Sequence, residues 1–78
     1  MRLTAKQEAA MKAALQAQEE ARDNGRDYFK TDPDELLVTV ARYAAMAYGD
    51  DTNRQIAFLQ GYIDARQKRD EYKRERSQ

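Results

Sequence analysis

The sequence predicts an all-α fold, a small three-helix bundle with helices at about residues 5–24, 33–48 and 52–75. Helix-forming residues such as Ala, Glu, Gln, Lys and Arg dominate the composition. Gly25, Pro33 and Gly49 fall between the helix-forming segments, and within the segments apolar residues recur at spacings of three and four. Because a chain of 78 residues has room for one core only, residues 1–78 are expected to form a single helical domain.

The first helix is predicted to start after Thr4, because Thr4 and Gln7 have the spacing of a capping box. Asn24 and Gly25 suit the left-handed conformation that ends many helices, so the helix is expected to end there. Its apolar stripe is thin, and we expect it to lean on a neighbour with larger side chains. The stripe consists of Ala10, Met11, Ala14, Ala17 and Ala21, with Leu15 beside it.

Residues 25–32 are expected to form a connector in which Tyr28, Phe29 or both are buried. The second helix has a strong start signal, because Asp32 can cap it and Pro33 suits the first helical position. It is expected to run to Tyr48 and to end at Gly49. Apolar residues lie almost all around it, so we expect a central helix that is partly covered by a second chain, in a homodimer.

The third helix is predicted to start near Thr52, with Gln55 completing a second capping box. Gly61 interrupts its apolar rows, which makes most sense if another backbone passes close by. Residues 66–78 are expected to form a projecting, charged helical tail. The apolar residues form two adjacent rows, one of Ile56, Leu59 and Ile63 and one of Phe58, Tyr62, Ala65 and Tyr72.

The net charge is zero, but the charges are distributed unevenly. Residues 27–51 contain six acids and two bases, a balance of −4, whereas residues 66–78 contain six bases and three acids, a balance of +3. No apolar run approaches the ~18 residues that span a bilayer, so we expect no membrane contact and a soluble, cytoplasmic protein.

The composition argues against most catalytic chemistry. The chain has no His and no Cys, and its one serine is Ser77 near the end, so a Ser-His or Cys-His nucleophile is excluded. The acidic groups at residues 32–35 and 50–51 precede expected helices, where capping explains them better than acid–base catalysis or metal binding. The glycines are too widely separated for a phosphate loop. We therefore expect no enzyme, no cofactor and no metal site.

Binding is the function that remains, and two classes of partner are open. The first is a larger protein or protein complex, for which the chain would be an adaptor or inhibitor. The second is nucleic acid, with phosphates bound by Arg66–Arg76, although acids are interspersed among these bases and indicate a solvated helix face. A helix-turn-helix over residues 37–67 is disfavoured because two acids follow the turn. The candidate partner-binding residues are Tyr43, Met46, Arg69, Tyr72, Lys73, Arg76, Asp32, Asp34 and Glu35.

In its general character, short, highly charged, cysteine-free and helical, the chain resembles the small accessory proteins of bacteria and their phages. Many of those proteins act by blocking a larger host complex. The resemblance implies a location in the host cytoplasm if the chain is encoded by a phage. It also implies a use for Asp32, Asp34 and Glu35, as a mimic of nucleic acid, although helix capping already accounts for these acids.

Overall fold

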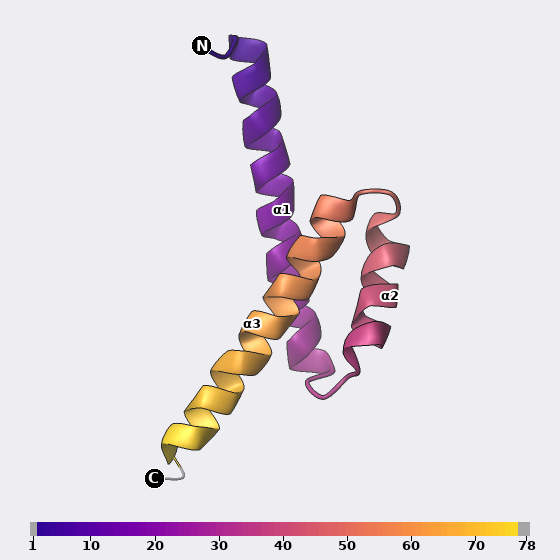
Figure 1. Cartoon of the computed structure of the whole chain (residues 1–78), viewed down its shortest axis with the longest axis vertical. Coiled ribbons are helices and arrows are strands. Elements are labelled where there is room, and N and C mark those ends of the chain that lie inside the picture. The colour runs from indigo at the N-terminus through magenta and orange to yellow at the C-terminus, as the bar shows by residue number, and fades with distance from the viewer. Residues whose placement is uncertain (1, 77–78) are drawn as a thin grey trace.

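The computed structural model of the chain describes residues 2–76 and contains α1 (Ala5–Thr31), α2 (Leu37–Tyr48) and α3 (Thr52–Arg76). Within these residues there is no strand, so the predicted all-α class is confirmed. α1 and α3 cross one another, α2 lies beside the first half of α3, and the two termini lie at opposite ends (Figure 1). The molecule is elongated, with extents of 53 × 29 × 17 Å.

α1 begins as predicted but does not end at Gly25. The Gln7 amide donates to the Thr4 hydroxyl at 3.1 Å, and the Thr4 amide donates to Gln7 Oε1 at 2.9 Å, which confirms the capping box. The helix then continues to Thr31, so the predicted connector over residues 25–32 is wrong for all but its last residue. Gly25 is buried inside the helix rather than placed at its end.

Glycines allow the backbones of α1 and α3 to touch where the helices cross. A Cβ atom on Gly25 would lie 2.0 Å from the carbonyl oxygen of Phe58, and one on Gly61 would lie 2.0 Å from the carbonyl oxygen of Arg22. The buried residues Ala21 and Ala57, four positions before each glycine, extend the same small-residue faces. The close approach predicted from Gly61 is confirmed, and Gly25 is its counterpart on α1.

α2 begins four residues later than predicted. It starts at Leu37, and residues 32–36 form the loop between α1 and α2. Asp32 is the C-cap of α1, with its amide donating to the Tyr28 carbonyl at 2.9 Å, so its predicted role as N-cap of α2 is wrong. The prediction for the other end is confirmed, because Gly49 follows Tyr48 with a φ of 58°, a conformation that favours glycine.

α3 begins at Thr52 as predicted, but its cap is different. Asp51 Oδ1 accepts from the Arg54 amide at 3.2 Å, so Asp51 takes the capping role that the sequence assigned to Thr52. The Gln55 side chain donates to the carbonyl of Gly49, which ties the start of α3 to the end of α2.

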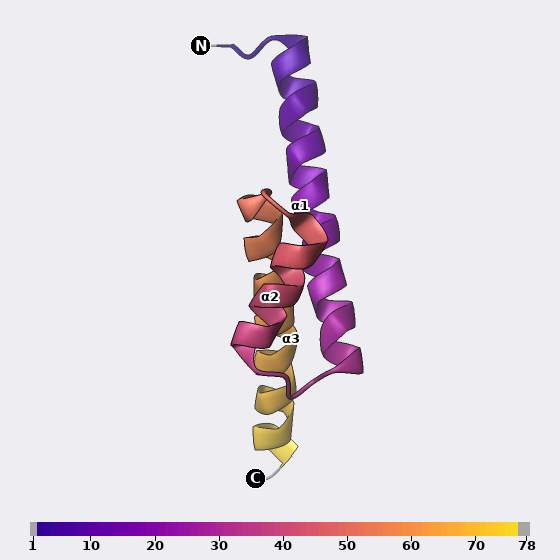
Figure 2. The same ribbon diagram turned by 90° about the vertical axis from the view of Figure 1, so that its right-hand side faces the viewer.

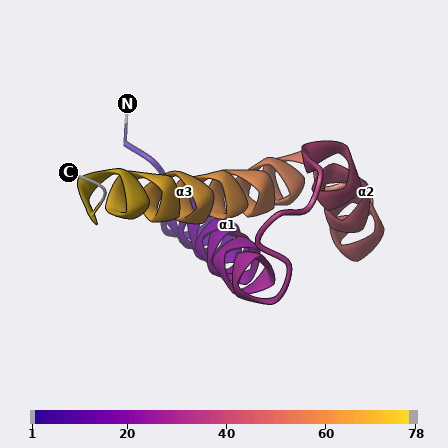
Figure 3. The ribbon, with the colours of Figure 1, turned by 90° about the horizontal axis from the view of Figure 1, so that it is seen from below.

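The small core is organised around α3 and not around α2. Its buried members are Val40 and Ala44 from α2 and Phe58 and Tyr62 from α3, with Tyr28, Phe29, Tyr48 and Leu59 packed against them. Both aromatic residues of the predicted connector, Tyr28 and Phe29, are thus half-buried against this core. α1 and α2 lie against different sides of α3 (Figure 3), which makes α3 the central helix and corrects the prediction for α2.

The first half of α1 has no neighbour among the described residues. Residues 2–16 are exposed, Ala17 is half-buried and Ala21 is the first buried position. α1 extends well beyond the start of α3 (Figure 2), so the predicted packing of the alanine stripe against another helix is wrong for most of its length. We call residues 5–16 the N-terminal arm.

Candidate interaction surfaces

The hydroxyl of Tyr62 holds the loop between α1 and α2 against α3. Tyr62 is fully buried, and its hydroxyl donates to the Asp32 carbonyl at 3.0 Å and accepts from the Glu35 amide at 3.0 Å. Residues 32–36 are outside any helix, so their backbone groups need partners. Asp32 and Glu35, two predicted partner-binding residues, therefore take part in the fold through their backbones.

Arg69 fastens the same loop from further along α3. Its guanidinium donates to Asp34 Oδ1 at 2.9 Å and to the Pro33 carbonyl at 3.4 Å, and it lies over the ring of Phe29 at 5.2 Å. Arg66 adds a hydrogen bond of 3.4 Å to the Glu35 carbonyl. The structure thus brings two predicted partner-binding residues, Arg69 and Asp34, together as partners of each other.

This pair shifts the acid–base equilibrium of Asp34. The hydrogen bond from Arg69 lowers the pKa of the Asp34 carboxyl below its ordinary value, and the positive charges of Arg69 and Lys73 add to the effect. In return, the hydrogen bond to Asp34 raises the pKa of Arg69. Asp34 is therefore charged in the folded protein even in moderately acid solution.

We expect Asp34→Asn to lower the free energy of unfolding by a small amount at pH 7, as for an exposed ion pair. Because the folded pKa of Asp34 is depressed, its stabilising effect is present above the unfolded pKa of about 3.9 and is lost as the pH falls through the folded value. Urea unfolding at neutral and strongly acid pH measures this. The two proteins should differ at pH 7 and converge in acid, with Asp50→Asn as a matched control. A difference that persists in strong acid would contradict the assignment.

α2 carries two of the predicted contact residues at its surface. Tyr43 is half exposed, with its ring 4.8 Å from that of Tyr28 and 5.5 Å from that of Phe58. Met46 is 86% exposed.

The neighbouring Tyr28 of α1 has a raised pKa. Burial of its phenol is the main cause, and the negative charges of Asp32 and Glu35 add to it, so this phenol stays neutral.

The last turns of α3 project beyond the core. Residues 70–76 are exposed, and the guanidinium of Arg76 lies 5.6 Å from the centre of the Tyr72 ring. Lys73 contributes to the charge around Asp34. Ser77 and Gln78 of the predicted tail lie outside the described residues. Tyr72, Lys73 and Arg76 are therefore together on a projecting segment, apart from Tyr43 and Met46.

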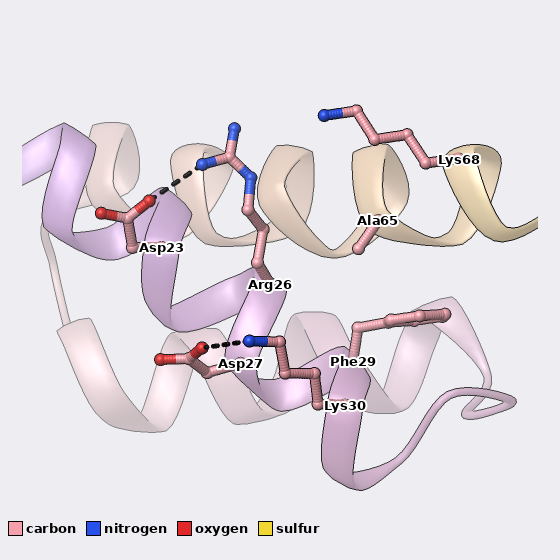
Figure 4. A pocket seen from close by; sticks show the side chains of 7 residues that line it. All are labelled: Asp23, Arg26, Asp27, Phe29, Lys30, Ala65 and Lys68. Carbon is pink, nitrogen blue, oxygen red and sulfur yellow. Dashed lines mark hydrogen bonds and ion pairs between the residues drawn. The ribbon is translucent and has the colours of Figure 1, made fainter.

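A shallow groove of about 480 Å³ runs between α1 and α3. Its charges are mostly paired within α1, Arg26 with Asp23 at 2.9 Å and Lys30 with Asp27 at 3.7 Å (Figure 4). Phe29 forms its apolar wall, and Lys68 lines the groove from α3. No group of three or more potential metal ligands occurs in residues 2–76. The groove offers a charged and apolar contact surface rather than converging reactive groups.

The sequence-based prediction omitted several exposed apolar residues. Met11 and Leu15 lie on the N-terminal arm, Val38 on α2 and Ile56 on α3, and about half or more of each is exposed. Met11 and Ile56 stand in the apolar rows that indicated core residues, so the pattern itself gave no sign of their exposure. For the N-terminal arm, the small size of the alanine side chains was the sign of exposure, since a helix face with so little apolar area gains little from packing in a core.

No protein-family model, curated protein or solved structure matches this chain. None of the helices within residues 2–76 has the length and apolar character required to cross a membrane.

Proposed function

We propose that this chain is a small protein–protein interaction module, an adaptor or inhibitor that docks on a larger protein through its N-terminal arm. The proposal rests on one observation, that the chain exposes more surface than a compact protein of the same mass. The chain exposes 6304 Å², whereas a compact protein of 9.1 kDa exposes about 4,900 Å². The difference of about 1,400 Å² exceeds the roughly 800 Å² per partner that a standard interface buries.

The N-terminal arm is the segment whose helix has the least support from the fold. An isolated helix shorter than about 12–15 residues is marginally stable in water, and helices in proteins rely mainly on packing of an apolar face. The arm, residues 5–16, is supported by its continuity with the rest of α1, by its capping box and by its alanine-rich composition, and not by packing of an apolar face. Its exposed Ala10, Met11 and Ala14 recur at helical spacing, which is the pattern of a helix that binds in the groove of a partner.

Phosphate binding by Arg66–Arg76 receives less support. Arg66 and Arg69 donate to the loop between α1 and α2, and Arg69 also donates to Asp34, so these two bases are engaged within the fold. Asp70, Glu71 and Glu75 lie among the remaining bases. A base that is held within the fold neutralises no phosphate, so its engagement reduces both the affinity for nucleic acid and the dependence of that affinity on salt.

The proposal is tested by affinity capture from cells that encode the chain, with quantitative mass spectrometry. We expect one partner or complex to be captured by the wild-type chain and at least tenfold less of it by Met11→Lys, because a charge would enter the apolar contact. Ala9→Lys is the matched control, since it adds the same charge to the same arm about 160° around the helix, and it should retain the partner. Both positions are exposed, so neither change should affect folding.

Equal capture by Met11→Lys and the wild-type chain would contradict a role for the arm. A titration of labelled duplex DNA at about 50 and 200 mM salt decides the competing hypothesis. Binding that weakens steeply with salt, and that is abolished when Lys73 and Arg76 are replaced by Gln, would favour phosphate recognition instead.

A further inference from the structure

α2 and α3 present a second apolar surface, on the side of this helix pair that faces away from α1. In α3, Gly61 marks the side that touches α1. Successive residues of an α-helix are rotated by about 100°. The residues five before, two before and two after Gly61 therefore lie about 140–160° around the helix from it, on nearly the opposite side of α3. Those positions are Ile56, Leu59 and Ile63.

The same spacing occurs in α2. Tyr43 marks the side that faces α1, because its ring lies 4.8 Å from that of Tyr28. Positions five before, two before and two after Tyr43 are Val38, Ala41 and Ala45, again about 140–160° away. We call the six residues of these two rows the outer face.

The two rows lie side by side. α2 and α3 are joined by the short turn at residues 49–51, and the Gln55 side chain bonds to the carbonyl of Gly49 at one end of the pair. At the other end, the Tyr62 hydroxyl bonds to Glu35. This pairing places Ala45 level with Ile56 and Val38 level with Ile63 on one continuous surface. Val38 is 57% exposed and Ile56 is 48% exposed. Ala45 is also exposed, whereas Ala41, Leu59 and Ile63 are half-buried, and none of the six residues is charged.

We propose that a second copy of this chain covers the outer face, so that two α2–α3 pairs form a four-helix bundle from which the arms project. A pair of antiparallel helices with a partly exposed apolar face is half of such a bundle, and an identical pair supplies the matching half. The absence of charge in the outer face means that self-association brings no like charges together. The net charge of zero adds no long-range repulsion between copies.

The small size of the chain also argues that a second copy covers the outer face. Small domains rarely obtain more than about 3–5 kcal/mol from their core and often need disulfides, metals or oligomerisation. This chain has no Cys, and its largest fully buried side chains within the described residues are Tyr62, Phe58 and Val40. The proposal does not depend on the proposed function, because the arm lies outside the outer face.

Sedimentation equilibrium of the full chain, from about 1 to 200 µM, tests this inference. We expect the wild-type chain to dimerise, and Val38→Lys and Ile56→Lys each to raise the dissociation constant of the dimer at least tenfold. Met46→Lys is the matched control, since it makes the same change at a more exposed position of α2, and it should alter the constant less than twofold. A monomer throughout the concentration range, or equal weakening by Met46→Lys, would overturn the proposal.

Hydrogen exchange of the wild-type chain provides a readout that needs no variant. If the outer face is the dimer interface, protection of the amides in α2 and in the first half of α3 should rise with protein concentration. Exchange in the N-terminal arm should stay the same. Protection that rises in the arm and not in α2 would assign self-association to the arm and refute the outer face.

Discussion

Gly25→Ala and Gly61→Ala are each expected to remove about half of the protein's free energy of unfolding, a net loss of about 2 kcal/mol. The added Cβ would lie 2.0 Å from a backbone carbonyl oxygen of the opposite helix, a contact that no side-chain movement relieves. The helices would have to separate at their crossing. Overpacking of this kind typically destabilises by about 1–3 kcal/mol and occasionally by more, and contact with rigid backbone places both variants at the upper end.

The helix propensity of alanine opposes this destabilisation, but its effect is smaller. Alanine favours helix over glycine by about 1 kcal/mol, so each substitution would stabilise its helix if the crossing allowed it. The sign of the measured change therefore decides which effect dominates. The net loss of about 2 kcal/mol is roughly half of the 3–5 kcal/mol that a core of this size supplies.

Circular dichroism during urea and thermal unfolding measures the outcome. Gly49→Ala is a useful control because a Cβ at Gly49 would meet no atom within 4 Å of the described structure, although the φ of 58° is unfavourable for alanine. It should destabilise by about 1–3 kcal/mol through local strain while α1 and α3 remain packed. If Gly25→Ala instead stabilised the protein, the close crossing of α1 and α3 would be wrong.

The second large effect is expected at Tyr62. Tyr62→Ala would remove a fully buried aromatic side chain, a change that typically destabilises by about 3–5 kcal/mol, and would leave little folded protein. Tyr62→Phe separates the two roles of this residue. It keeps the ring in the core but leaves the Glu35 amide and the Asp32 carbonyl without the hydroxyl, which should destabilise by about 1 kcal/mol because the site is only partly buried.

The same unfolding measurements test the Tyr62 variants, with Tyr72→Phe as control. Tyr72 is exposed on the projecting end of α3, so its change should stay within about 0.5 kcal/mol. Hydrogen exchange adds a local readout. In Tyr62→Phe, the amides of residues 34–36 should exchange faster, that of Glu35 most of all, while those of α2 change little. Unchanged exchange in the loop would mean that the hydroxyl does not hold it.

Some helix boundaries were predictable because their signals act over a few residues. The capping pair Thr4 and Gln7 and the end of α2 at Gly49 depend on local geometry, and both predictions were confirmed. The end of α1 was not predictable in this way. Asn24 and Gly25 have the composition of a helix end, but Gly25 is required inside the helix, where the backbone of α3 approaches.

The prediction for the start of α2 was wrong for a similar reason. Asp32, Pro33, Asp34 and Glu35 form a favourable helix start by local rules, yet Tyr62, Arg66 and Arg69 bind this segment as a loop. These partners lie about thirty residues further along the chain, outside the range of any capping rule. The same distance hid the pairing of Arg69 with Asp34, so both residues looked free to contact a partner.

By itself the sequence determined that this protein is helical, because helix propensity and the spacing of apolar residues act locally and point the same way along the chain. It also determined that Gly61 marks a close backbone approach and that no His or Cys is present for chemistry. Only the tertiary structure decided which helix is central, where the first loop lies and which apolar residues stay exposed. Those outcomes depend on which distant segments pack together in one small core. α3 is the central helix because its small residues allow the backbone of α1 to approach closely, while its Phe58 and Tyr62 pack against α2 and the loop.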